Sequence, residues 1–161
     1  MIRMSTRARY ALRAMMELAA RSSDGAVQLH SIAKEQQLSV KYLEQIVRPL
    51  RLAGLIVSER GSSGGYRLGR PASEITALDI VQAVEGPVFV VDCVARPSIC
   101  PRSPWCVAHC LWGRVGEAIS GVLAQANLAE MARLQQATIG GLPTSGEVSA
   151  CATRDESAPA E

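Results

Sequence analysis

The sequence predicts a mainly α-helical protein with one small β-hairpin, arranged as a winged helix-turn-helix followed by a long C-terminal helix. Three observations support this fold class. Apolar residues recur with a helical period over residues 5–54, a glycine-rich hairpin pattern covers residues 55–69, and a second apolar helical stripe covers residues 111–126. Short helices joined by a tight turn and followed by a hairpin are typical of DNA-binding modules.

The first two helices are expected over residues 5–21 and 29–37. The apolar face of the first helix consists of residues at helical spacing, namely Leu12, Met15, Met16 and Ala19. The polar run over residues 22–25 predicts the turn between these helices.

A third helix is expected to start at Val40, because Ser39 is a good N-cap, and to be closed by Gly54. Its middle contains Pro49, which has no N–H to donate to the carbonyl of Gln45. We therefore expect the third helix to kink or break at Pro49, which leaves its first two turns to read DNA bases.

The hairpin is expected to pair residues 55–59 with residues 66–69 around the glycine-rich turn 60–65. Thr76 is then expected to cap a further helix with Asp79 as its capping-box partner, and that helix should end at Gly86-Pro87.

The C-terminal part should contain a long helix over residues 111–126 and a short helix from Asn127 to Gln136. The apolar stripe of the long helix consists of Leu111, Val115, Ala118, Ile119, Val122 and Ala126. Such a stripe needs a partner, and we interpret it as the seam of a homodimer. The alternative is that the stripe packs on its own domain.

Four domains or segments are therefore expected. They are a DNA-binding domain (1–86), a cysteine-rich loop (87–110), a dimerisation helix with the following short helix (111–138), and a disordered tail (139–161). The tail contains Cys151, which we do not expect to bind a metal.

Charge is distributed unequally along the chain. Residues 1–70 contain 12 Lys and Arg against 5 Asp and Glu, whereas residues 71–161 contain 5 against 10. A basic half is expected of a protein that binds the phosphate backbone of nucleic acid, although a solvated basic surface is the alternative. The sequence shows no secretion signal and no apolar run of about 18 residues, so we expect a cytoplasmic protein without a membrane segment. It also lacks hydrolase and P-loop motifs, which predicts that it is not an enzyme.

Four of the five cysteines lie close together in the pattern C-x6-C-x5-C-x2-H-C: Cys93, Cys100, Cys106 and Cys110, with His109 before the last. Thiolates gathered in this way suit an iron–sulfur cluster, zinc or Cu(I). The long gaps are loose for zinc, which prefers closely spaced cysteine pairs, so an iron–sulfur cluster is favoured. Zinc and metal-free thiols that respond to oxidation are the alternatives.

Candidate DNA contacts lie at the start of the third helix and in the hairpin turn. Gln45 can bond adenine through two hydrogen bonds, and Ser39 and Lys41 can reach base edges or phosphates. Tyr42 either contacts a phosphate or packs under the helix. Arg60 is expected to enter a minor groove, with a plain surface position as the alternative. The turn glycines Gly61, Gly64 and Gly65 expose backbone there.

At these positions the chain resembles the Rrf2 family of bacterial transcription regulators. The resemblance covers residues 2–135, and its most specific piece is the turn sequence R-G-x-x-G-G-Y from Arg60 to Tyr66. Other matching segments are 8–11, 39–45, 50–55 and 80–86. The resemblance implies a homodimeric regulator that binds double-stranded promoter DNA and carries a long dimerisation helix.

The resemblance also implies an iron–sulfur cluster bound by Cys93, Cys100 and Cys106, which occupy the place of three cluster ligands in the family. In the branch that regulates iron–sulfur cluster assembly, a histidine three residues after the third cysteine is the fourth ligand of a [2Fe–2S] cluster. His109 matches that histidine. The first gap is one residue longer here, and Cys110 is a rival fourth ligand, so a [4Fe–4S] cluster stays possible.

The resemblance therefore predicts that the cluster controls promoter binding and responds to iron, redox or nitric oxide status. The alternative is a cluster-free regulator of the same fold that responds to thiol oxidation or to a protein partner.

Overall fold

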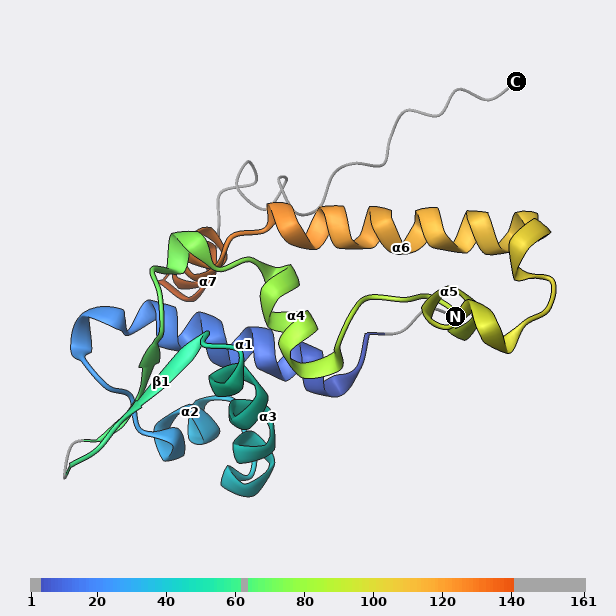
Figure 1. Cartoon of the computed structure of the whole chain (residues 1–161). Helices are drawn as coiled ribbons and strands as arrows, with labels where there is room; N and C mark the ends of the chain where they lie inside the picture. The colour runs from blue at the N-terminus through green and yellow to red at the C-terminus, as the bar shows by residue number, and fades with distance from the viewer. Residues whose placement is uncertain (1–3, 62–63, 141–161) are drawn as a thin grey trace.

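Helix α1 (Thr6–Ala20) is surrounded by α3, α4 and α7 in the computed structural model, which describes residues 4–61 and 64–140 (Figure 1). The helix begins after Ser5, whose hydroxyl accepts a hydrogen bond from the amide of Ala8. Because helices pack on several of its sides, its buried residues are Ala8, Ala11, Ala14, Met15 and Leu18. The predicted apolar face was therefore wrong in part, since Leu12, Met16 and Ala19 only pack at the edge of the core.

Helices α2 (Leu29–Glu35) and α3 (Val40–Leu52) form the predicted helix-turn-helix. Helix α2 ends two residues earlier than expected, and Gln37 in the turn has a positive φ of 53°. The hydroxyl of Ser39 accepts from the Tyr42 amide at 3.2 Å, which confirms Ser39 as the N-cap of α3. Gly54, at a φ of 71°, ends α3 as predicted, since its amide donates to the carbonyl of Arg51.

Pro49 lies inside α3 without ending it, so the expected break was wrong. The missing proline N–H leaves the carbonyl of Gln45 without its helical donor. The guanidinium of Arg7, on α1, donates to this carbonyl oxygen at 3.3 Å. A side chain from another helix therefore replaces the lost bond, and α3 continues to Leu52.

Strands β1 (Ile56–Glu59) and β2 (Gly65–Leu68) pair antiparallel, with Ile56 opposite Leu68. Both strands are displaced or shortened by one residue relative to the prediction. Val27 and Tyr66 exchange two backbone hydrogen bonds of 2.8 Å, which attach the loop before α2 to β2. A Cβ at Gly65 would lie 2.4 Å from the Val27 carbonyl oxygen, so this close approach requires glycine.

Helix α4 (Ala77–Glu85) starts with the predicted capping box, because Thr76 and Asp79 exchange side-chain and backbone hydrogen bonds. The same stretch of chain is fixed to the C-terminal part of the protein. The Ala77 amide donates to the Ala126 carbonyl, and the Leu128 amide donates to the Ile75 carbonyl, both at 2.8 Å. These two bonds hold the junction of α6 and α7 against the start of α4.

Helix α7 (Leu128–Gly140) packs against α1, and its residues Leu128 and Ala132 are buried. The hydrophobic core therefore includes residues beyond the expected DNA-binding domain of residues 1–86. The helix also extends four residues beyond the expected end at Gln136. Most of the predicted disordered tail, with Cys151, lies outside the described residues.

Helix α6 (Val107–Gln125) runs along one side of the molecule and contacts α4 and α5 (Asp92–Ala95) (Figure 1). It begins four residues before the predicted start at Leu111, so part of the expected loop is helical. The rest of that loop also contains regular structure, since α5 and two short 3₁₀ turns (Pro97–Ile99 and Ser103–Trp105) form there. None of the described helices is both long and apolar enough to cross a membrane.

Candidate nucleic-acid interface and cysteine segment

Three polar side chains lie on one exposed face of α3: Lys41, Gln45 and Arg48. Their spacing of four and three residues places them on neighbouring turns of the helix. Neither Lys41 nor Arg48 has an ion-pair partner among the described residues, so both charges are available to phosphates. Arg48 was not among the predicted DNA contacts, although its position seven residues after Lys41 indicates the same face of the helix. We call these three residues the exposed α3 face.

Tyr42 is half-buried beside this face and packs under the helix. Its ring meets that of Tyr10 edge-to-face, with 6.1 Å between the centroids. The guanidinium groups of Arg9 and Arg13 lie 5.4 and 5.6 Å from the Tyr10 ring centroid. The start of α3 is thus bordered by two further cations from α1.

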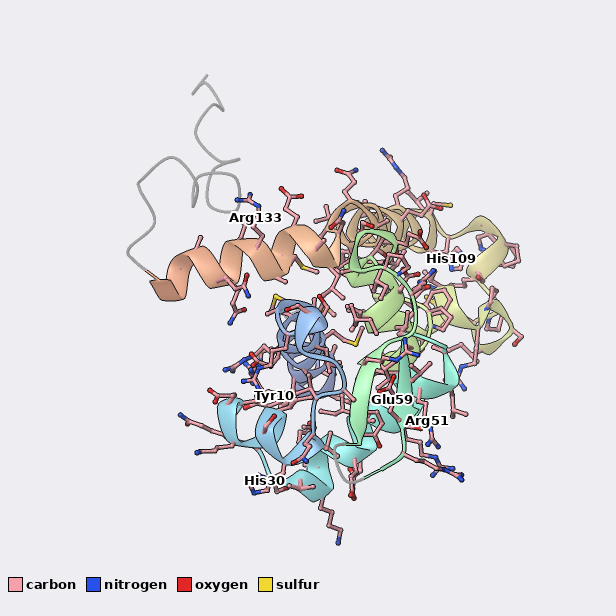
Figure 2. All side chains as sticks on the ribbon, turned by 90° about the vertical axis from the view of Figure 1, so that its left-hand side faces the viewer. Tyr10, His30, Arg51, Glu59, His109 and Arg133 are labelled. Carbon is pink, nitrogen blue, oxygen red and sulfur yellow. The ribbon has the colours of Figure 1, made fainter. Side chains whose placement is uncertain are left out.

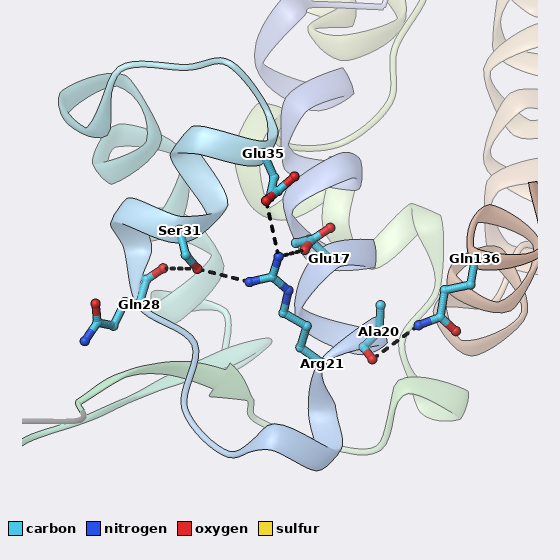
Figure 3. A network of polar contacts seen from close by, with 7 residues as sticks. All are labelled: Glu17, Ala20, Arg21, Gln28, Ser31, Glu35 and Gln136. Carbon is cyan, nitrogen blue, oxygen red and sulfur yellow. Dashed lines mark hydrogen bonds and ion pairs between the residues drawn. The ribbon is translucent and has the colours of Figure 1, made fainter. Parts of the chain in front are cut away.

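The position of α2 relative to α1 is fixed by Arg21, the residue that follows α1 (Figure 3). Its guanidinium lies 2.6 Å from the carboxylate of Glu17 and 3.8 Å from that of Glu35, and it donates to the Ser31 hydroxyl at 3.2 Å. Glu35 and Ser31 belong to α2, the helix that supports α3. Each of these partly exposed ion pairs contributes roughly 0–1 kcal/mol, so the network orients α2 more than it stabilises the fold.

The hairpin turn presents one unpaired cation. Arg60 is exposed and has no ion-pair partner in residues 4–61 and 64–140, whereas Arg67 on β2 is neutralised by Glu59. Gly61 has a φ of 130°, a conformation that favours glycine. A Cβ at Gly64 would lie 2.6 Å from the Glu59 carbonyl oxygen. The turn glycines therefore have a structural requirement of their own, independent of any contact with DNA.

The cysteine segment, residues 93–110, holds all five candidate ligands on consecutive local structures. Cys93 lies on α5, Cys100 follows the first 3₁₀ turn, and Cys106 is the N-cap residue of α6. His109 and Cys110 are the third and fourth residues of α6. Cys93, Cys100 and Cys106 are half-buried free thiols, and Cys110 is an exposed one.

Within the described residues, no three His, Cys, Asp or Glu side chains lie close enough to hold a metal ion. Two of the predicted ligands, Cys100 and His109, do line one open pocket of about 510 Å³. The Ser103 hydroxyl lies in the same pocket, 3.1 Å from Nδ1 of His109. The other histidine, His30, lies on α2 at the far side of the molecule from His109 (Figure 2). The donor set of thiols and one imidazole fits an iron–sulfur cluster in its chemistry.

Comparison with known proteins gives consistent matches along most of the chain. Residues 4–134 match the Rrf2 family model, which is described as an iron-dependent transcriptional regulator. The HTH-type transcriptional regulator IscR of Photorhabdus laumondii is 37% identical over 135 residues, which cover 84% of this chain and 82% of that protein.

Two solved structures are similar in both sequence and fold. T. potens IscR matches with a TM-score of 0.69 and 34% identity, over 89% of this chain and 93% of its own. CymR, the global cysteine regulator of B. subtilis, matches with a TM-score of 0.67 and 41% identity, over 83% of this chain and 98% of its own.

Proposed function

Because the chain belongs to the Rrf2 family of transcriptional regulators, we propose that it is a homodimer whose promoter binding is controlled by an iron–sulfur cluster. The observation that carries this proposal is the placement of the cysteine segment, which leads directly into α6. A change at the cysteines would therefore act on the helix that we assign to the dimer seam. The relatives are named as transcriptional regulators, which confirms the expectation that the chain is not an enzyme.

The exposed α3 face is the surface that we assign to the major groove. Gln45 would read a base, and Ser39, Lys41 and Arg48 would contact the backbone or base edges, while Tyr42 would support the helix from below. Arg60 would enter the minor groove. The turn residues Gly61, Gly64 and Gly65 would let the hairpin backbone approach the DNA. Two such modules related by a two-fold axis recognise an inverted repeat.

The proposed partner for α6 is the same helix of a second copy. Gly116 is the only residue of this 19-residue helix that is buried in the single chain. Leu111 and Val122, both on the predicted stripe, are 52% and 70% exposed. Burying a side chain of this kind contributes about 1.5–3 kcal/mol, so pairing the stripes of two copies would stabilise a dimer.

We assign Cys93, Cys100, Cys106 and His109 as the cluster ligands, with Cys110 as the rival for the fourth position. These residues would have to close on the metal, and the chain between them consists of short turns with few contacts to the core. A bound cluster, [2Fe–2S] in this ligand set, supplies redox activity and a negative charge that is lost when the cluster is lost. Cys106 and His109, at the start of α6, would transmit that change to the seam.

The test is anaerobic purification of the whole chain followed by visible absorbance and iron and sulfide analysis. We expect a coloured protein whose cluster is lost in the Cys93→Ser, Cys100→Ser and Cys106→Ser variants. His109→Ala should destabilise the cluster, and Cys110→Ala should not. The reverse pattern would indicate a cluster bound by four cysteines, and a triple-serine variant with wild-type iron content would contradict the assignment.

A cluster-free regulator that responds to thiol oxidation is the second candidate. It is favoured by the four free thiols of the described residues, which do not converge on one point. In that case anaerobic protein would be colourless and would still bind promoter DNA. Peroxide would then release the DNA, and dithiothreitol would restore binding.

A further inference from the structure

Ser103 stands out in the cysteine segment because it is buried among exposed neighbours. Only 9% of its surface is exposed, and it is one of two buried polar residues in the described chain. Its hydroxyl lies 3.1 Å from Nδ1 of His109, and its amide donates to the Cys100 carbonyl at 3.0 Å. One residue therefore connects the two candidate ligands that line the same pocket.

We propose that Ser103 is a positioning residue that holds the imidazole of His109 by Nδ1 and so presents Nε2 to iron. This inference rests on the proposed function, in which His109 is the fourth ligand. Histidines that bind metals regularly use their second ring nitrogen for a hydrogen bond, which fixes the orientation and tautomer of the ring. Here the bond to Ser103 leaves Nε2 as the free nitrogen.

The hydroxyl suits this role because its oxygen can accept a hydrogen bond from the imidazole N–H. When Nε2 is bound to iron, the single proton of the neutral ring is on Nδ1, and Nδ1–H donates to the Ser103 oxygen. In the metal-free protein the same bond favours the tautomer with the proton on Nδ1, which leaves Nε2 unprotonated and free to bind iron.

The same geometry bears on the choice between His109 and Cys110. Cys110 is exposed, and no hydrogen bond to its thiol is present among the described residues. His109 is half-buried, in the pocket with Cys100, and its ring is held in place before any metal arrives. Holding a ligand in advance lowers the entropy that binding costs, so Ser103 favours the histidine.

The first arm of the test uses metal-free whole chain labelled with ¹⁵N-histidine, at a pH where imidazole is neutral. The chain has only two histidines, so the spectrum is simple and exposed His30 is the internal reference. Long-range ¹H–¹⁵N correlations should show that the tautomer with the proton on Nδ1 is preferred at His109 in the wild type. In Ser103→Ala the tautomer ratio should approach that of His30, and Ser103→Thr should restore it. Ser98→Ala is the matched control, because Ser98 lines the same pocket.

The second arm uses the cluster-loaded, reduced protein with the same label, examined by pulsed EPR. We expect one well-defined nitrogen coupling in the wild type and a broadened or divided coupling in Ser103→Ala. Loss of such a supporting bond typically costs about 10- to 100-fold in metal affinity, so the cluster should be lost correspondingly faster in that variant.

The outcomes separate the two proposals. A histidine-coupled cluster with identical spectra in wild type and Ser103→Ala, in both arms, would overturn the role of Ser103 alone. A cluster without any histidine coupling in the wild type, or a protein without a cluster, would overturn the ligand assignment and this inference with it. Rescue by Ser103→Thr with no effect of Ser98→Ala supports the role.

Discussion

The hydrogen bond from Arg7 to the Gln45 carbonyl should be needed only because residue 49 is proline. Arg7→Met keeps most of the aliphatic stem of the side chain and removes the guanidinium. In the wild type this leaves the Gln45 carbonyl without a donor in the middle of α3. In Pro49→Ala the alanine amide can donate to the same carbonyl, as in any regular helix. The effect of Arg7→Met should therefore depend on residue 49.

The magnitude follows from the strength and exposure of this bond. Hydrogen bonds to charged groups contribute about 1.5–3 kcal/mol when buried. The 3.3 Å bond of Arg7 is exposed to solvent, so we expect about 1 kcal/mol for Arg7→Met in the wild type and about 0.2 kcal/mol in Pro49→Ala. The coupling free energy is then about 0.8 kcal/mol.

The assay is urea unfolding of the four proteins of the cycle, followed by circular dichroism at 222 nm in reducing buffer. Pro49→Ala also changes the flexibility of the unfolded chain, but this contribution is present in both backgrounds and cancels in the cycle. Equal costs of Arg7→Met in the two backgrounds, at equal m-values, would refute the reasoning. The continuation of α3 beyond Pro49 would then need another explanation.

Three further predictions concern the core, the seam and base reading. Leu128→Ala should lower the free energy of unfolding by about 2–5 kcal/mol, because this side chain is fully buried in the core although it lies after α6; urea unfolding measures this, and a cost below about 1 kcal/mol would contradict the placement. Val122→Glu should yield folded monomers in sedimentation equilibrium, since Val122 is 70% exposed in the single chain, whereas Ala124→Glu on another face should leave a dimer. A dimer of unchanged affinity in Val122→Glu would exclude the seam. Gln45→Ala should lose about 1–3 kcal/mol of discrimination at one position of each half-site, and Lys41→Ala should weaken all sequences alike and lower the salt dependence. Competition binding at several salt concentrations distinguishes the two variants, and unchanged base preference in Gln45→Ala would refute its role.

The sequence by itself determined the features that depend on residues a few positions apart. Ser39 caps α3 and Thr76 forms a capping box with Asp79, because a cap needs only an oxygen and the amide three residues later. Gly54 ends α3 for a similar reason, since the left-handed conformation favours glycine whatever surrounds it. Local hydrogen bonds and backbone sterics are readable without the fold.

The candidate site was predictable to the same extent. The exposed α3 face follows from helical spacing, and the cysteine segment follows from composition. The start of α6 at Val107 was missed because residues 106–110 were assigned to the cysteine-rich loop, although Val107 and Ala108 lie four and three residues before Leu111 and continue its apolar stripe. The bond between Ser103 and His109 was hidden too, since the path of the chain through two 3₁₀ turns decides which side chains meet.

Only the tertiary structure decided where distant segments supply what a local element lacks. Arg7 meets the Gln45 carbonyl from 38 positions away, so α3 continues through a proline that would otherwise end it. Leu128 joins a core whose other buried residues lie more than 40 positions earlier in the chain. Two backbone hydrogen bonds make this possible, because they hold the junction of α6 and α7 against α4. A helix from any part of the chain can supply a missing hydrogen-bond donor or complete a core. The spacing of residues in the sequence does not reveal such a contact.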